Sequence, residues 1–201
     1  MKKNRLLVLL CCFVLCVSFL AGCGKNKTDL PESTKPDKSV VTPQTISLPF
    51  DQPLDFGFSS GAGAWYTSLT LKPDGTFSGS YHNSEMGNVG EGYPLGTVYC
   101  ADFSGKFTDI EKTDDYSYKM KLSEFDIENE GNEYIEDEMR YVVSMPNGMD
   151  GTEYVFYVPQ TPVENLSDEF LNWRKIKDDS VNQLSVYGIE NKTTGIGFFA
   201  Y

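Results

Sequence analysis

The chain has 201 residues, of which 13% are aromatic and 23% charged, a length that suits one folded domain with an ordinary core. Lys2, Lys3 and Arg5 precede Cys23 and no acidic residue does, so the chain from Cys23 onward carries 14 basic and 29 acidic residues, a formal charge of −15. Such an acidic excess excludes nucleic acid as an expected partner, and it disfavours adhesion to anionic lipid headgroups without a separate anchor.

Residues 1–22 have the layout of a secretory signal peptide. A basic tip, Met1–Arg5, precedes an apolar run from Leu6 to Ala21 that ends in small residues. The run has 16 residues, whereas a helix that spans a bilayer needs about 20. We therefore expect a cleaved leader rather than a retained transmembrane helix.

The leader ends in Leu20-Ala21-Gly22-Cys23, which resembles the lipobox of bacterial lipoproteins. The resemblance implies cleavage before Cys23 and attachment there of acyl chains of the palmitate type, including a diacylglyceryl group on the thiol. Two or more acyl chains hold a protein at a bilayer, where one chain holds it only marginally. We therefore expect a protein held on the outer face of the cell membrane through the lipidated Cys23. An ordinary cleaved signal peptide is the alternative.

Residues 23–45 show no hydrophobic period. They contain three prolines and charges of both signs, the composition of a chain that cannot bury enough apolar surface to fold. The sequence therefore predicts a disordered tether over 23–45, followed by a single β domain over 46–201.

Apolar and polar side chains alternate over several stretches of residues 46–201, the pattern of half-buried β-strands. Trp65–Leu71 and Phe77–Tyr81 flank the turn residues Pro73-Asp74-Gly75, which predicts a β-hairpin. A short helix is expected near 162–175, with Thr161 or Ser167 as its N-cap. Further strands are expected over 99–107, 116–122, 139–145, 154–158, 184–190 and 195–201.

These segments predict an all-β fold of about eight strands, an antiparallel meander that forms an up-and-down barrel or a strongly bent sheet. Closure into a barrel removes exposed strand edges. Gly63-Ala64-Trp65 and the late helix resemble the lipocalin or wider calycin arrangement. The tracts 58–65, 93–100 and 103–107 also resemble uncharacterised lipoproteins of low-GC Gram-positive bacteria, a resemblance that implies no activity.

Sequence patterns that could indicate a catalytic site occur in an unsuitable structural context. Residues 57–61 fit Gly-x-Ser-x-Gly, and Asp74 and His82 follow, but a nucleophile elbow leads from a strand into a helix, and this segment leads into a strand. Neither His82 nor the 147–153 loop has a recognised metal-ligand spacing. A carboxylate pair within 124–130 for glycoside hydrolysis would need a cleft. We therefore expect a non-catalytic protein without a metal or cofactor.

Aromatic side chains are the remaining candidates for a site. A small barrel of about eight strands is either filled by its side chains or holds one small ligand. The leading prediction is a binding lipoprotein whose barrel takes a small apolar or sugar-like ligand. The alternative is a surface interaction or assembly protein with a filled barrel and acidic loops that meet an unknown protein partner. The residues expected to contact a ligand are Trp65, Tyr81, Tyr99, Tyr118 and Tyr141.

Overall fold

The computed structural model describes residues 46–174 and 180–201. The predicted signal peptide, the predicted attachment residue Cys23 and the predicted tether lie outside these residues. The described chain forms these elements: β1 (Leu54–Ser59), β2 (Trp65–Leu71), β3 (Thr76–Glu85), β4 (Thr97–Lys112), β5 (Ser117–Ile127), β6 (Glu133–Glu136), β7 (Met139–Val143), β8 (Glu153–Tyr157), a 3-10 helix (Val163–Asn165), α1 (Asp168–Arg174), β9 (Gly188–Asn191) and β10 (Gly197–Ala200).

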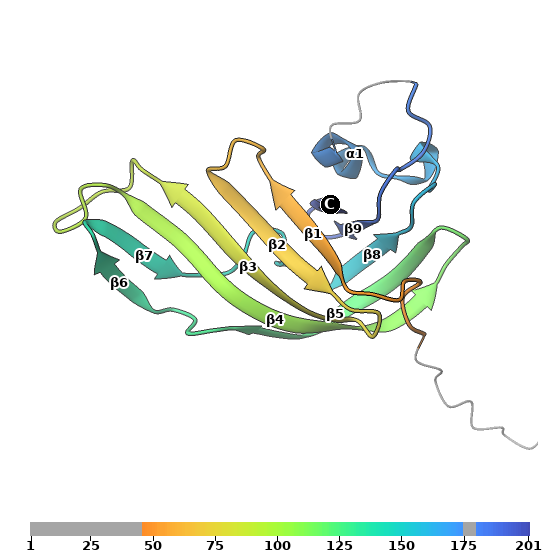
Figure 1. The fold of residues 1–201 in the computed structure, drawn as a ribbon, viewed down its shortest axis with the longest axis horizontal. Helices are drawn as coiled ribbons and strands as arrows, with labels where there is room; N and C mark the ends of the chain where they lie inside the picture. Colours follow the sequence, from red (N-terminus) through yellow and green to blue (C-terminus); the bar gives the residue numbers. More distant parts are fainter. Residues whose placement is uncertain (1–45, 175–179) are drawn as a thin grey trace, which may run out of the picture. The chain divides into compact units, whose positions relative to one another are not determined.

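Eight strands form a closed ring. Its order is β3-β2-β1-β10-β9-β8-β5-β4, and pairing of β3 with β4 closes it. Every pair of neighbours in the ring is antiparallel. Figure 1 shows β1 to β4 side by side along one wall, in chain order from orange to green. The predicted antiparallel barrel is confirmed.

The β2–β3 hairpin follows the alternation in the sequence. Thr67, Leu69 and Leu71 are buried in β2, and the residues between them are more exposed. At the turn, the Asp74 carboxylate accepts hydrogen bonds from the Thr76 hydroxyl (2.7 Å) and amide (3.0 Å), and these bonds lower the pKa of Asp74. Gly75 has a φ of 84°, which suits glycine because a Cβ would be strained there. The turn residues therefore set the register of the hairpin.

Aromatic rings pack through the interior of the barrel. Phe107 lies 4.8 Å from Phe77 and 5.0 Å from Tyr154, measured between ring centroids. Phe156 lies 6.3 Å from Phe56. All five residues are at most 3% exposed. Burial of each such side chain stabilises the fold by about 1.5–3 kcal/mol, so this cluster makes a substantial contribution to stability.

The β6–β7 hairpin lies outside the ring and differs from a simple meander. β5 pairs with the second half of β4, and β7 pairs with the first half, Thr97–Cys100, in a parallel direction. The β6–β7 hairpin reverses the direction of the chain, so β7 runs parallel to β4. Asp137 and Glu138 both have positive φ, the geometry of a two-residue type I′ turn, and they return the chain alongside β4.

The predicted helix is present in two pieces, the 3-10 helix and α1. Ser167 is the N-cap of α1, since its hydroxyl accepts a hydrogen bond from the Phe170 amide at 3.1 Å. Thr161, the other candidate, donates its hydroxyl to the Val158 carbonyl at 2.6 Å instead. Phe170 is fully buried between Tyr157 and Phe199, which anchors α1 on β8 and β10. Within residues 46–174 and 180–201, no helix combines the length and apolar character needed to cross a membrane.

Candidate binding site at the barrel mouth

An open pocket of about 420 Å³ lies where β1 and β2 meet α1 and the loop before β8. Its volume falls within the range of small-molecule sites, roughly 300–1,000 Å³. Most of the side chains around it are apolar or aromatic. The lining residues are Phe58, Trp65, Met145, Pro146, Asn147, Gly148, Asp150, Trp173 and Ile196.

Three aromatic rings form one wall of this mouth pocket. Phe58 on β1 is 4% exposed and lies 4.8 Å from Trp65 and 4.7 Å from Trp173 between ring centroids. The two indoles are 6.3 Å apart and nearly perpendicular, at 79°. Trp173, on α1, is 38% exposed. Part of the indole surface at Trp173 is therefore open to a ligand, and the buried Phe58 ring packs against both indoles.

The 145–150 loop also lines the pocket and is held by hydrogen bonds. The Thr67 hydroxyl donates to the Asn147 carbonyl at 2.9 Å. The Asn191 side-chain amide donates to the Gly148 carbonyl at 2.9 Å, and the Tyr154 hydroxyl donates to the same oxygen at 3.4 Å. Burial, together with the nearby Asp150 charge, raises the pKa of Tyr154, so its phenol remains a donor. These hydrogen bonds hold the backbone of the loop in place at the pocket.

The structure places one of the five predicted ligand residues, Trp65, in this pocket. Tyr81 and Tyr118 are buried in the barrel core. Tyr99 packs against the core, and its hydroxyl accepts a hydrogen bond from the Asn88 side-chain amide at 3.0 Å. Tyr141, on β7, stacks on Tyr134 with a centroid distance of 5.0 Å. The five residues are not brought together in one site.

Trp173 is the site residue that sequence reasoning missed. It recurs with Leu166 and Phe170 at helical spacing, and this period predicts a buried face of the helix. Phe170 occupies that buried position, whereas Trp173 lies one turn further along and reaches Trp65. The sequence does contain one signal, the second tryptophan. An indole on a short helix presents more apolar surface than that helix can bury by itself, so a contact with another element is expected.

The residues of the Gly-x-Ser-x-Gly pattern and its followers bond locally. His82 Nε2 lies 2.8 Å from the Ser84 hydroxyl, and the Asp74 carboxylate is engaged by Thr76. The Ser59 hydroxyl accepts a hydrogen bond from the Gly61 amide at 3.3 Å. In the part of the chain that the structure describes, no group of three or more His, Cys, Asp or Glu side chains is arranged to hold a metal ion.

Comparison with known proteins identifies no relative of this chain. No protein family, no curated protein and no solved structure matches the chain at a significant level.

Proposed function

We propose that this chain is a membrane-tethered, extracytoplasmic binding protein that takes a small apolar or sugar-like ligand without changing it chemically. The two indoles that meet edge to face at the barrel mouth carry this proposal. The lipobox-like Leu20–Cys23 supports the location, because acylation at Cys23 would hold an acidic domain at the membrane.

The chemistry of the mouth pocket selects a compact ligand. The faces of Trp65 and Trp173 favour an apolar chain, an aromatic ring or the C–H face of a pyranose. Asn147 and Asp150 stand at the same pocket and can bond one polar group of the ligand. The Asp150 carboxylate disfavours an anionic ligand. The ligand is therefore neutral or cationic, with one apolar face.

The ligand binds at the mouth rather than in the lumen in this proposal. Phe77, Phe107 and Tyr154 already make ring contacts across the interior. A filled interior is equally compatible with the alternative function, a surface interaction protein whose acidic loops meet a protein partner. Direct binding of a small molecule at the mouth separates the two functions.

Tryptophan fluorescence tests the mouth pocket directly, because Trp65 and Trp173 are the two tryptophans of the whole chain. We expect N-phenyl-1-naphthylamine, a neutral apolar probe, or methyl β-glucoside to change the emission of the full-length protein saturably. Trp173→Ala removes one wall and leaves Trp65 as the reporter, so the Kd should rise by about tenfold or more, equivalent to about 1.4 kcal/mol.

Tyr116→Ala is the matched control, because Tyr116 lies on the β4–β5 turn and does not line the mouth pocket. It should leave the Kd unchanged. Equal affinity of the Trp173→Ala variant and the parent protein would contradict the proposed site. If neither probe changes the emission, the mouth pocket binds neither ligand class and the interaction role becomes the better explanation.

A further inference from the structure

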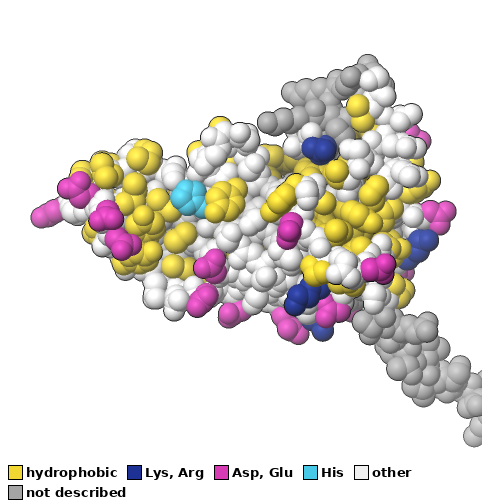
Figure 2. Space-filling view, viewed as in Figure 1, with side chains coloured by type: hydrophobic (Ala, Val, Ile, Leu, Met, Phe, Trp, Pro, Cys, Tyr) yellow, Lys and Arg dark blue, Asp and Glu magenta, His cyan; other side chains and the backbone are white. Residues whose placement is uncertain are grey.

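A second hollowed surface crosses the outer face of the barrel wall. Two adjoining hollows, of about 530 and 420 Å³, share Ser80, Asp102 and Glu128 and so form one groove over β2, β3 and β4. In Figure 2, hydrophobic side chains lie on both sides of the single histidine, beside a white band of backbone and side chains that are neither hydrophobic nor charged, with acidic side chains along its edge. We call this surface the outer groove.

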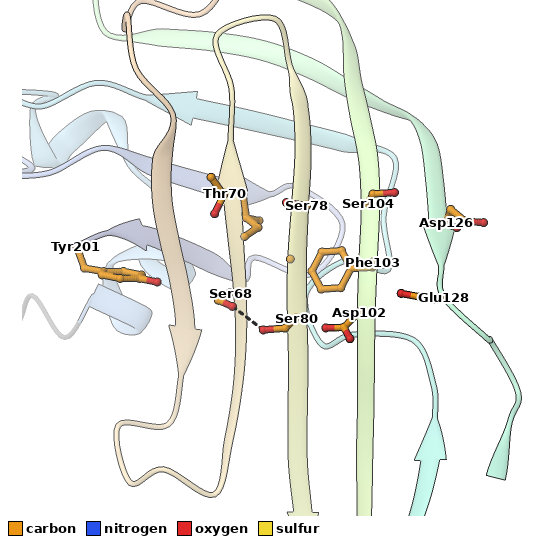
Figure 3. A pocket seen from close by; sticks show the side chains of 12 residues that line it. Ser68, Thr70, Ser78, Ser80, Asp102, Phe103, Ser104, Asp126, Glu128 and Tyr201 are labelled. Atoms are coloured by element: carbon orange, nitrogen blue, oxygen red, sulfur yellow. Dashed lines mark hydrogen bonds between the residues drawn. The ribbon is translucent and has the colours of Figure 1, made fainter.

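Small hydroxyl side chains form the floor of the outer groove. Ser68, Ser80 and Asp102 lie opposite one another on β2, β3 and β4, and the Ser68 and Ser80 hydroxyls are 3.0 Å apart. Figure 3 shows these side chains on the same side of neighbouring strands. A parallel row contains Thr70, Ser78, Ser104 and Asp126. Hydroxyls both donate and accept hydrogen bonds, so the floor matches a ligand that has many hydroxyls of its own.

Paired aromatic rings border the floor. On one side, Tyr66 stacks on His82 with a centroid distance of 5.7 Å and an interplanar angle of 17°. On the other side, Tyr134 stacks on Tyr141 at 5.0 Å and 9°. Tyr66 and Tyr134 are 43% and 48% exposed, and both line the second hollow. An exposed ring at each border of a polar floor offers a stacking surface to sugar rings, whose C–H faces are apolar.

The charge of the outer groove restricts the class of ligand that it can bind. Asp102, Asp126 and Glu128 line it, and none of the residues that line the two hollows is a lysine or arginine. Carboxylates accept hydrogen bonds from sugar hydroxyls or from an ammonium group, and they repel anions. The groove therefore fits a chain of sugar rings without negative charge.

From the groove, its hydroxyl floor and its two ring pairs, we propose that the outer groove is a second binding site for a neutral or amino-sugar oligosaccharide. Tyr66 and Tyr134 provide stacking platforms, and Asp102 and Glu128 bond hydroxyl or ammonium groups between them. The two adjoining hollows hold several sugar units in a row. This site lies on the outer face of the β2–β4 wall and does not depend on a ligand at the mouth.

Isothermal titration calorimetry on the full-length protein tests this site with three hexasaccharides: cellohexaose (neutral), the glucosamine hexamer (cationic) and hexagalacturonate (anionic). We expect cellohexaose, the glucosamine hexamer or both to bind saturably, and hexagalacturonate not to bind. Tyr66→Ala and Tyr134→Ala should each raise the Kd by about tenfold or more. Tyr66→Phe, which keeps the ring, should stay within about threefold of the parent protein, and Tyr116→Ala, which lines neither the outer groove nor the mouth pocket, should bind like the parent.

Several outcomes would overturn the inference. One is no heat of binding for either cellohexaose or the glucosamine hexamer at millimolar concentration, in a protein with the parent thermal transition. Another is an affinity that neither tyrosine substitution changes. A hexalysine peptide provides the contrast: if it binds in the groove and no saccharide does, the groove is a docking surface for basic peptides. Loss of binding in Trp173→Ala alone would move the saccharide to the mouth pocket.

Discussion

At the scale of single residues, Glu190 on β9 links the barrel wall to α1. It is 1% exposed, and its carboxylate accepts hydrogen bonds from the Tyr157 hydroxyl (2.7 Å), the Ser167 hydroxyl (2.6 Å) and the Lys192 ammonium (2.9 Å). Burial and the hydrogen bond to Glu190 raise the pKa of Tyr157, so its phenol stays protonated and donates. Because Ser167 also caps α1, the buried carboxylate holds the helix that carries Trp173.

Glu190→Gln tests this network. The amide group keeps the size of the side chain but presents an N–H to donors and removes the charge that pairs with Lys192. We expect a loss of about 1–3 kcal/mol in the free energy of unfolding, measured by urea denaturation. Glu153→Gln, at an exposed position on the neighbouring β8, is the control and should change stability by under about 0.5 kcal/mol. Equal effects of the two substitutions would show that the Glu190 contacts do not stabilise the fold.

At the scale of elements, β3 and β4 contain two reciprocal pairs of glycine and phenylalanine. Gly79 on β3 lies opposite Phe103 on β4, and Phe77 lies opposite Gly105. A Cβ at Gly79 would overlap the Phe103 ring and the Ser68 carbonyl oxygen. Each phenylalanine ring therefore fills the space above the glycine on the other strand and compensates for its missing side chain. The absence of a side chain at these glycines lets the two strands bend closely around the core.

Gly79→Ala tests the need for this close approach. The added methyl group meets backbone as well as a buried ring, so neither neighbour yields easily, and we expect a loss of at least about 2 kcal/mol in unfolding free energy. Gly87→Ala is the control, because a Cβ there has open space around it. A fall in the thermal transition that is no larger for Gly79→Ala than for Gly87→Ala would rule out the packing explanation.

At the scale of the whole molecule, the proposed anchor at Cys23 would set where the domain works, and the chain from Cys23 onward has a formal charge of −15. An acidic chain is not attracted to an anionic membrane surface, so in this proposal acyl chains on Cys23 supply the attachment. The proposed ligands are accordingly molecules that reach the outer face of the membrane.

Cys23→Ala should abolish labelling with radioactive palmitate in a bacterial host and shift the protein from the membrane fraction to the aqueous fraction, or leave an uncleaved precursor. Cys16→Ala is the matched control, since Cys16 lies inside the apolar run and outside the lipobox-like residues. It should be processed normally. Normal processing and membrane retention of Cys23→Ala would contradict the anchor.

The sequence by itself determined most of the barrel, for a local reason. The two-residue period places Thr67, Leu69 and Leu71 on one face of β2, and the structure buries that face. Turn residues such as Gly75 act over a few positions and so can be predicted from neighbours alone. The antiparallel strands and the β2–β3 hairpin are confirmed for this reason, and Ser167, one of the two predicted N-caps, is the one that the structure uses.

Only the tertiary structure decided which distant residues meet. Trp65 and Trp173 are more than a hundred positions apart, and they become neighbours because Phe170 packs α1 against β8 and β10. The parallel pairing of β7 with β4, which brings Tyr134 on the adjoining β6 to the outer groove, likewise depends on contacts across the sheet. The hydrophobic period of a strand or helix indicates which face of that element a side chain occupies. It does not report which other strand or helix covers that face, and so neither candidate site could be assembled from the sequence.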